Sequence, residues 1–230
     1  MASAIDTIGR LERVTLGDRV HRQLRELLMA GKLMPGEKLS LRSVAASLGV
    51  SMMPVREAVA QLVAEDALTV LPNRAVSVPV MTKRRFRELR AIRVMLEGYA
   101  AEQAAQQCCE ADLAQIREAD AQFRRAVGGP TPDPVAALRW NMNLHFAVYR
   151  AAQSPSLLAI IEGLWLKVGP VINLDLRASA ERLCAGASER LHARLLAAIE
   201  AGDGAGAREA LVEDINGSAA FIEATGNLPD

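Results

Sequence analysis

Apolar residues recur at helical spacing in two short segments near the start of the chain, one on each side of a glycine. The first segment begins after Ser40, a residue type favoured as a helix N-cap. Its apolar positions are Leu41, Val44, Ala45 and Leu48. Gly49 ends the segment, because glycine enters the left-handed cap conformation without a Cβ penalty. We therefore expect a short helix that is closed by a sharp turn.

The second segment begins after Ser51, which is again a suitable N-cap. Pro54 falls in its first turn, where a missing N–H breaks no intrahelical hydrogen bond. Its buried face is expected to consist of Val55, Ala58, Val59, Leu62 and Val63. The remaining positions, among them Arg56 and Gln61, then point outward.

Two β-rich stretches follow the second helix and predict a hairpin. Residues 68–71 and 75–80 carry the β-rich arms, and Pro72-Asn73-Arg74 forms the turn between them. An amphipathic helix over 15–30 precedes these elements and is expected to pack beneath the two short helices. The order of elements predicts a winged helix-turn-helix, a unit that usually binds DNA.

From residue 82 onward the apolar spacing stays helical and no strand is predicted. The expected helices span 82–107, 110–127, 134–153, 155–177, 180–201 and 204–225. Helices joined by such short connections pack antiparallel to their neighbours, which gives a bundle. The predicted fold class is therefore mainly α, with a winged helix-turn-helix domain over 1–80 and an all-α antiparallel helical bundle over 81–230.

Composition and charge agree with this fold, but they exclude few classes of function. Hydrophobic residues make up 50% of the chain and aromatic residues only 3%, which favours packed helices over a sandwich or barrel. The formal net charge of +0 gives no sign of a uniformly basic surface. Three cysteines, two of them adjacent, fit no disulfide framework.

The most apolar stretch, 157–174, is expected to be a buried core helix, because Glu162 and Lys167 interrupt it. The N-terminal residues lack the continuous apolar core of a signal peptide. We therefore expect a cytoplasmic protein that has no membrane span.

Four segments resemble the DNA-binding domain of GntR-type transcriptional regulators. They are PGEKLS at 35–40, LGVS at 48–51, PVREAV at 54–59 and LPNRAVSV at 71–78. The all-helical remainder resembles the FCD (FadR C-terminal domain) subclass, in its VanR-like six-helix form. The resemblance implies a homodimer that binds a palindromic operator in double-stranded DNA.

The resemblance also implies which residues contact DNA. They are Arg42, Ser51, Met52, Met53, Arg56 and Arg74. Either of the arginines at 42 and 56 can bind guanine bidentately, whereas the arginine at the wing tip is expected in the minor groove or on the backbone. Met52 stands where family members commonly carry arginine, so that contact is lost or becomes an apolar touch on a thymine methyl. The alternative is that these arginines are ordinary solvated surface charges.

Four polar residues of the helical part are spaced so that helix packing can gather them. Asn141 and His145 lie four apart on one predicted helix, and therefore on one face. His192 and Asp214 each lie eleven residues from Asp203, so an antiparallel hairpin places them at the same height. These positions coincide with the metal-binding pattern of FCD domains, which usually has one aspartate and three histidines.

Two of these four positions depart from the family pattern. Asn141 replaces the aspartate, and Asp214 replaces the last histidine. Two imidazoles and one carboxylate still form a suitable ligand set for Zn²⁺ or a similar divalent ion, with Asn141 as a weak fourth ligand. The alternative is a hydrogen-bonded polar network inside the core.

Arg93 is assigned to effector binding by the same resemblance, because an arginine at this place in FCD proteins pairs with a carboxylate of the effector. Bidentate geometry suits arginine to that task. The alternative is a helix-surface ion pair with Glu97, four residues further on.

These expectations combine into a ligand-responsive transcriptional regulator, a repressor in the first instance, that is controlled by a small organic acid and is not an enzyme. Two other classes stay open from the residues alone. One is a metal-dependent, hydrolase-like enzyme that uses His145, His192 and Asp214. The other is a DNA-binding or architectural protein that responds to no ligand.

Overall fold

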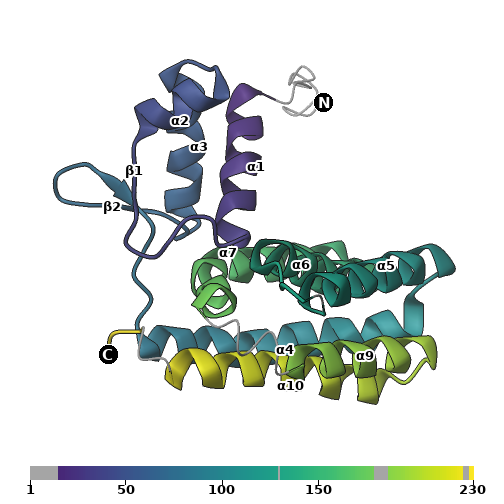
Figure 1. The fold of residues 1–230 in the computed structure, drawn as a ribbon. Coiled ribbons are helices and arrows are strands. Elements are labelled where there is room, and N and C mark those ends of the chain that lie inside the picture. The colour runs from purple at the N-terminus through teal and green to yellow at the C-terminus, as the bar shows by residue number, and fades with distance from the viewer. Residues whose placement is uncertain (1–14, 129, 179–185, 225–227) are drawn as a thin grey trace, which may run out of the picture.

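The winged helix-turn-helix is built from short elements with well-defined ends. In the computed structural model, which describes residues 15–128, 130–178, 186–224 and 228–230, it comprises α1 (Leu16–Met29), α2 (Leu41–Leu48) and α3 (Met52–Ala64) (Figure 1). The strands are β1 (Lys38–Leu39), β2 (Thr69–Val70) and β3 (Val76–Ser77). We call residues 15–80 the head and the described residues from 81 onward the body.

Helix caps fix the ends of the head helices. Thr15 caps α1 and forms a capping box with Asp18. The hydroxyl of Ser40 accepts a hydrogen bond from the Ser43 amide at the start of α2. Gly49 ends α2 in the left-handed conformation, with φ 64°, as the sequence predicts. Ser51 occupies the N-cap position of α3, but its side chain makes no cap hydrogen bond.

The wing contains one strand that the sequence did not reveal. β3 is the central strand and pairs antiparallel with both β1 and β2. β1 lies directly before Ser40, where the sequence predicts no strand, because two residues are too few to show an alternating pattern. At the wing tip, Arg74 adopts φ 62°, and the Asn73 side chain accepts a hydrogen bond from the Ala75 amide.

The body consists of antiparallel helices in two layers. Its described elements are α4 (Lys83–Gln107), α5 (Glu110–Val127), α6 (Pro134–Ala151), α7 (Pro155–Ala178), α9 (Ala187–Glu200) and α10 (Gly204–Ala224). α4, α9 and α10 form one layer, and α5, α6 and α7 form the other (Figure 1). The predicted start of the fifth helix at 180 lies outside the described residues, as does Cys184. The mainly α fold class is confirmed, whereas the domain division after residue 80 stays a prediction.

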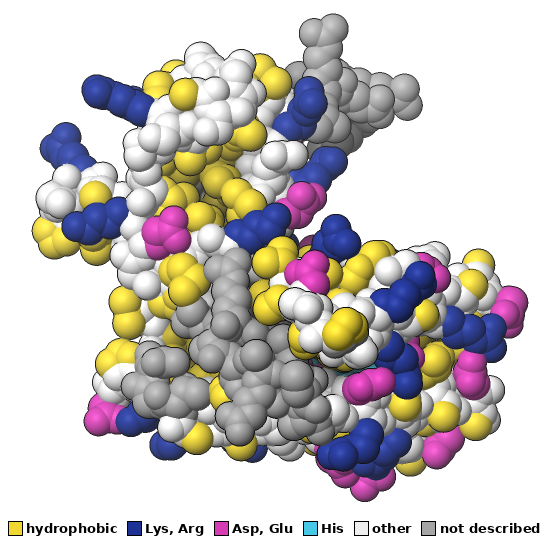
Figure 2. Space-filling model, viewed as in Figure 1, with side chains coloured by type: hydrophobic (Ala, Val, Ile, Leu, Met, Phe, Trp, Pro, Cys, Tyr) yellow, Lys and Arg dark blue, Asp and Glu magenta, His cyan; other side chains and the backbone are white. Residues whose placement is uncertain are grey.

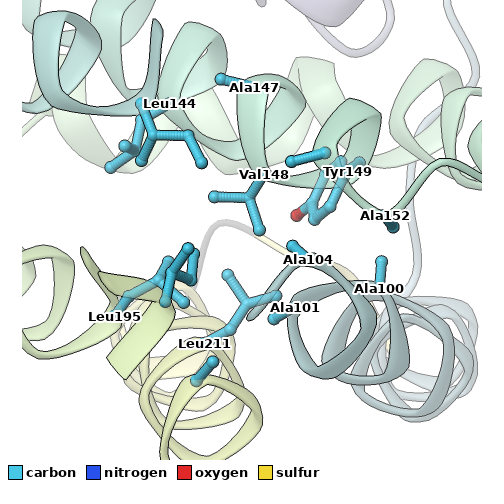
Figure 3. Packing of buried hydrophobic residues seen from close by; sticks show 14 of the residues in the cluster. Ala100, Ala101, Ala104, Leu144, Ala147, Val148, Tyr149, Ala152, Leu195 and Leu211 are labelled. Atoms are coloured by element: carbon cyan, nitrogen blue, oxygen red, sulfur yellow. The ribbon is translucent and has the colours of Figure 1, made fainter. Parts of the chain in front are cut away.

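The two layers of the body meet over small side chains. Leu144 and Val148 of α6 point toward the α4 alanines at 100, 101 and 104, with Leu195 and Leu211 beside them (Figure 3). Alanine at these positions lets the layers approach closely, while Phe146, Tyr149 and Trp165 fill other parts of the same core. This packing holds the inward faces of α4, α6, α9 and α10 in a fixed register.

α7 joins the body to the head. Its Leu166 is buried in the same hydrophobic cluster as the core of the head. Arg25 of α1 forms ion pairs with Glu65 at the end of α3 and with Glu162 of α7. A Cβ at Gly169 would lie 2.8 Å from the carbonyl oxygens of both Leu28 and Met29, so the glycine is what allows α7 to approach the end of α1.

α7 is also long and apolar enough to cross a membrane by length and composition alone. The window Pro155–Ile172 has a mean hydropathy of 1.4, but 56% of it is buried inside the protein. Its packing against α1, α4 and α6 is that of a core helix.

Candidate ligand site and DNA-facing surface

The body gathers two histidines and an aspartate in its interior. His145 of α6, His192 of α9 and Asp214 of α10 are all buried. His145 Nε2 lies 3.2 Å from Asp214 Oδ2, and His192 Nε2 lies 4.0 Å from the same oxygen. One donor atom from each residue lies within 4.8 Å of the others, so that small side-chain shifts would let all three contact one metal ion.

The turn between α9 and α10 sets this arrangement. Gly202 takes φ 69°, and the Asp203 carboxylate accepts a hydrogen bond from the Gly206 amide at the start of α10. The two helices then run antiparallel, and His192 and Asp214 face each other at equal distance from the turn. The symmetric spacing in the sequence therefore identified a real contact.

The environment of His192 suits a metal ligand. Among the described residues, neither of its ring nitrogens has a hydrogen-bond partner, although both are buried. Burial lowers the pKa of His192 to about 4, with His145 nearby acting in the same direction. The ring is therefore neutral at pH 7, which is the state in which imidazole binds a metal. An unpartnered buried imidazole is costly, and a bound cation would give one of the two nitrogens a partner.

Asn141 lines the same cavity as His145 and Asp214. It is buried, one turn before His145 on α6. With Arg93, His145 and Asp214 it lines a cavity of about 20 Å³. That volume holds about one water molecule or one ion.

A buried chain of polar groups leads from this cavity to α4. Arg93 donates to Glu97 through Nε (2.6 Å) and Nη2 (3.0 Å). The Tyr149 hydroxyl donates to Glu97 Oε2, and it lies 3.0 Å from His145 Nδ1. Arg93 and Glu97 are thus a buried pair and not the helix-surface pair that the sequence allowed. Trp165 covers the guanidinium, whose central carbon lies 5.1 Å from the ring centroid.

Burial and the charge of Glu97 shift the pKa values of Arg93 and Tyr149. Burial disfavours the charged form of Arg93, but the charge of Glu97 and its hydrogen bonds outweigh this, so that the pKa of Arg93 is raised. Burial and the nearby Glu97 charge raise the pKa of Tyr149 well above its usual value. Arg93 therefore stays charged and Tyr149 stays neutral.

The predicted DNA-contacting residues lie on the head surface. Arg42, Ser51, Met53, Arg56 and Arg74 are exposed. Within the described ranges, the three arginine side chains make no ion pair or hydrogen bond. Figure 2 shows basic side chains projecting from the outer part of the head and from the hairpin.

Met52 and Met53 differ from each other. Met52 is half-buried and packs against the head core, whereas Met53 is 64% exposed. If a methionine of this turn touches a base, Met53 is the better placed of the two. The thioether of Met52 therefore faces the core, at the position where family members commonly carry an arginine that can donate to guanine.

Sequence reasoning missed the central role of Glu97 and Tyr149. Each lies four residues after a predicted site residue, Arg93 and His145 respectively, so that each shares its helix face. That spacing was the available signal, but only the packing shows that both faces are buried.

Comparison with known proteins places both parts of the chain. Residues 16–78 match the family model "Bacterial regulatory proteins, gntR family", and residues 88–217 match the FCD domain. The chain is 32% identical to the HTH-type transcriptional regulator McbR of Escherichia coli (strain K12), over 93% of this chain and 96% of that protein. It is 29% identical to a probable D-xylose utilization operon transcriptional repressor of Paenarthrobacter nicotinovorans, over 95% of this chain and 92% of that one.

The fold has a solved counterpart. The structure of E. coli McbR/YncC superposes with a TM-score of 0.85 at 31% identity, covering 93% of this chain and 100% of that one.

Proposed function

Because the chain belongs to the GntR family of bacterial regulatory proteins and carries an FCD domain, we propose that it is a cytoplasmic, homodimeric repressor whose operator binding is controlled by a small organic acid and a divalent cation. It is a ligand-responsive DNA-binding transcriptional regulator. The observation that carries the finer proposal is the buried set of His145, His192 and Asp214, which lies beside the helix that docks onto the head.

The head supplies the DNA contacts. α3 would lie in the major groove, with Arg56 one turn from its N-terminus and Arg42 beside it on α2. Arg74 at the wing tip would contact the minor groove or the backbone. A dimer would present two heads to a pseudo-palindromic site whose symmetry matches its own.

The body would hold a divalent cation such as Zn²⁺. His145, His192 and Asp214 would be its ligands, and Asn141 a weaker fourth. The cation would supply positive charge to a buried site that has an unpartnered imidazole, and an organic acid could bind to it beside Arg93.

Transmission would run through α7. Trp165 contacts His145 at the site, with ring centroids 5.6 Å apart, and the next residue, Leu166, belongs to the head core. A ligand that moves Trp165 therefore also acts on the contact between α7 and α1. It changes DNA affinity only to the extent that it binds the two head arrangements with different affinity.

The hydrolase-like alternative is not favoured, because the matched family and the similar proteins are transcriptional regulators. An experiment distinguishes the proposed regulator from a DNA-binding protein that responds to no ligand. We would select duplexes from a random library with the purified protein, and then titrate the selected duplex with and without Zn²⁺ and a panel of small carboxylates. The proposal predicts enrichment of a pseudo-palindrome and release by at least one acid. Enrichment without release under any condition would support the ligand-independent class.

A further inference from the structure

The segment Leu228–Asp230 lies against the beginning of α4, where the chain enters the body from the head (Figure 1). The Lys83 amide donates a hydrogen bond of 2.8 Å to the Pro229 carbonyl oxygen. The Lys83 side chain pairs with Asp230, with Nζ 2.8 Å from Oδ1. Leu228 is only 5% exposed. We call Leu228–Asp230 the strap and residues 79–82 the join.

The strap completes the cap of α4. The first amides of a helix have no hydrogen-bond partner inside the helix. The Thr82 hydroxyl accepts a hydrogen bond from the Arg85 amide, and the Pro229 carbonyl accepts one from the Lys83 amide. The start of α4 is therefore fixed both by its own N-cap and by a contact from far along the chain.

Leu228 also closes a hydrophobic cluster beneath the join. The other members of the cluster are buried residues of the join, α4, α7 and α10: Met81, Phe86, Leu89, Val168, Val171, Ile172, Ala219 and Ile222. The same α7 contributes Leu166 to the core of the head. The strap thus packs where the two connections between body and head, the join and α7, come together.

The join is short, so the start of α4 and the wing are closely linked. Val78, which directly follows β3, donates to the Glu37 carbonyl and accepts from the Gly36 amide. Only the join separates Val78 from α4, and its first residue is a proline, which restricts φ. A displacement of the start of α4 therefore acts on the wing.

Open space beside the join leaves room for such a displacement. A crevice of about 470 Å³ lies between the head and the body. Leu68 of the head, Arg85 and Leu89 of α4 and Lys167 of α7 are among the residues that line it. Packing across this side of the join is therefore incomplete, and the strap holds the start of α4 from the other elements that it contacts.

We propose that the strap fixes the angle between the head and the body, and that its release loosens the head and weakens binding to an operator with two half-sites. A dimer contacts both half-sites only when its heads have the matching separation and orientation. Heads that move more freely lose more conformational freedom on binding, so their affinity is lower. The effect on DNA rests on the proposed homodimer, whereas the effect on the head does not.

Amide hydrogen exchange of the full-length protein provides the first test, because it needs neither DNA nor a ligand. Leu228→Ala should raise the exchange rate by about tenfold in peptides that cover residues 79–86. Leu113→Ala is the matched control, since Leu113 is 9% exposed in the core of the body, in the first turn of α5 after the far end of α4. It should leave these peptides unchanged. Leu228→Met keeps most of the side-chain volume and should exchange as the native protein does.

Operator titrations provide the second test, with a selected full-site duplex and with a duplex that carries one half-site. Leu228→Ala should bind the full site about fivefold more weakly than the native protein, and the half-site equally well, because a single head needs no fixed angle. Leu113→Ala and Leu228→Met should bind both duplexes as the native protein does. Thermal melts set a temperature at which all proteins are folded, and Leu228→Val replaces the alanine variant if that variant is partly unfolded.

Two results would overturn the strap. One is unchanged exchange over residues 79–86 in the Leu228 variant, or an equal rise in Leu113→Ala. The other is equal weakening on the full site and the half-site, which indicates a damaged head and not a loosened one. A native protein that binds the full site no more tightly than the half-site would instead overturn the proposed homodimer, and the exchange rates would then decide alone whether the strap fixes the head.

Discussion

Asp214 keeps a carboxylate in the buried cluster, although it stands where the family pattern has a histidine. Asn141 in turn stands where that pattern has an aspartate. The carboxylate of Asp214 lies close to both imidazoles, so the body still offers two nitrogen donors and one oxygen donor at one point. The exchange keeps one carboxylate but moves it from α6 to α10.

His192 gives the first prediction at this scale. His192→Ala removes one of three close donors, so the purified variant should lose bound Zn²⁺, measured by elemental analysis after dialysis. His21→Ala is the control, because His21 lies in the head, where it pairs with Glu65. Equal Zn²⁺ content in the His192 variant and the native protein would remove this residue from the site.

The same residue predicts a pH dependence of stability in metal-free protein. Burial lowers the pKa of His192 from 6.5 to about 4, so the unfolded chain binds a proton more readily than the folded one. The contribution of neutral His192 to the free energy of unfolding is therefore complete above pH 6.5. It is lost as the pH falls from 6.5 toward 4, by about 3 kcal/mol in total.

Urea unfolding at several pH values measures this effect. His192→Gln has no group that titrates in that range, so its free energy of unfolding should fall less steeply between pH 6.5 and 4. Parallel curves for the variant and the native protein would contradict the assignment.

Arg56 gives the prediction for the head. It is exposed, and within the described part of the chain its side chain has no partner, so its removal should leave the fold intact. Arg56→Ala should weaken operator binding by about 1–3 kcal/mol in a mobility-shift titration. An unchanged affinity would mean that α3 does not contact the bases through this residue. Arg87→Ala, at the surface of the body, is the control.

At the scale of elements, the sequence predicted what local rules decide. Ser40, Gly49 and Thr82 cap helices where their residue types favour it, and the glycine turn at 202–204 brings α9 and α10 together. β1 was missed, because its pairing with β3 is a long-range contact that leaves no periodic signal in two residues. The sequence left open whether Arg93 and Glu97 form a surface pair, because spacing gives the helix face but not which face is buried.

Gly169 of α7 allows a test of the contact between α7 and the end of α1. Gly169→Ala would place a Cβ 2.8 Å from two carbonyl oxygens of α1, which cannot move without displacing the helix end. The variant should be destabilised by about 1–3 kcal/mol and should transmit the ligand signal poorly, while Zn²⁺ binding persists.

Gly163→Ala is the matched control, since it lies on the same helix and a Cβ there meets nothing within 4 Å. It should be neutral or slightly stabilising. Thermal melts and operator titrations with and without ligand compare the two variants. Normal coupling in Gly169→Ala would show that the signal does not pass through the contact between α7 and α1.

At the scale of the whole molecule, the head exposes three arginines that have no partner within the described residues, and the body buries His145, His192 and Asp214 together. The sequence predicts a head that contains a β-hairpin and a body that is all helical, because the β-rich stretches lie within 68–80 and the apolar spacing from 82 onward is helical. It could not predict how the head sits on the body, because that depends on Leu166 and Gly169 of a helix whose pattern shows only that it is buried.

The central claim is that occupancy of the body changes the affinity of the head for DNA. The most direct measurement is the operator affinity of the full-length protein, by fluorescence anisotropy, for the metal-free form and for the form with Zn²⁺ and a bound carboxylate. The account predicts at least about a fivefold difference between the two forms, which corresponds to about 1 kcal/mol of coupling. Identical operator affinity in both forms, with the ligands shown to be bound, would contradict it.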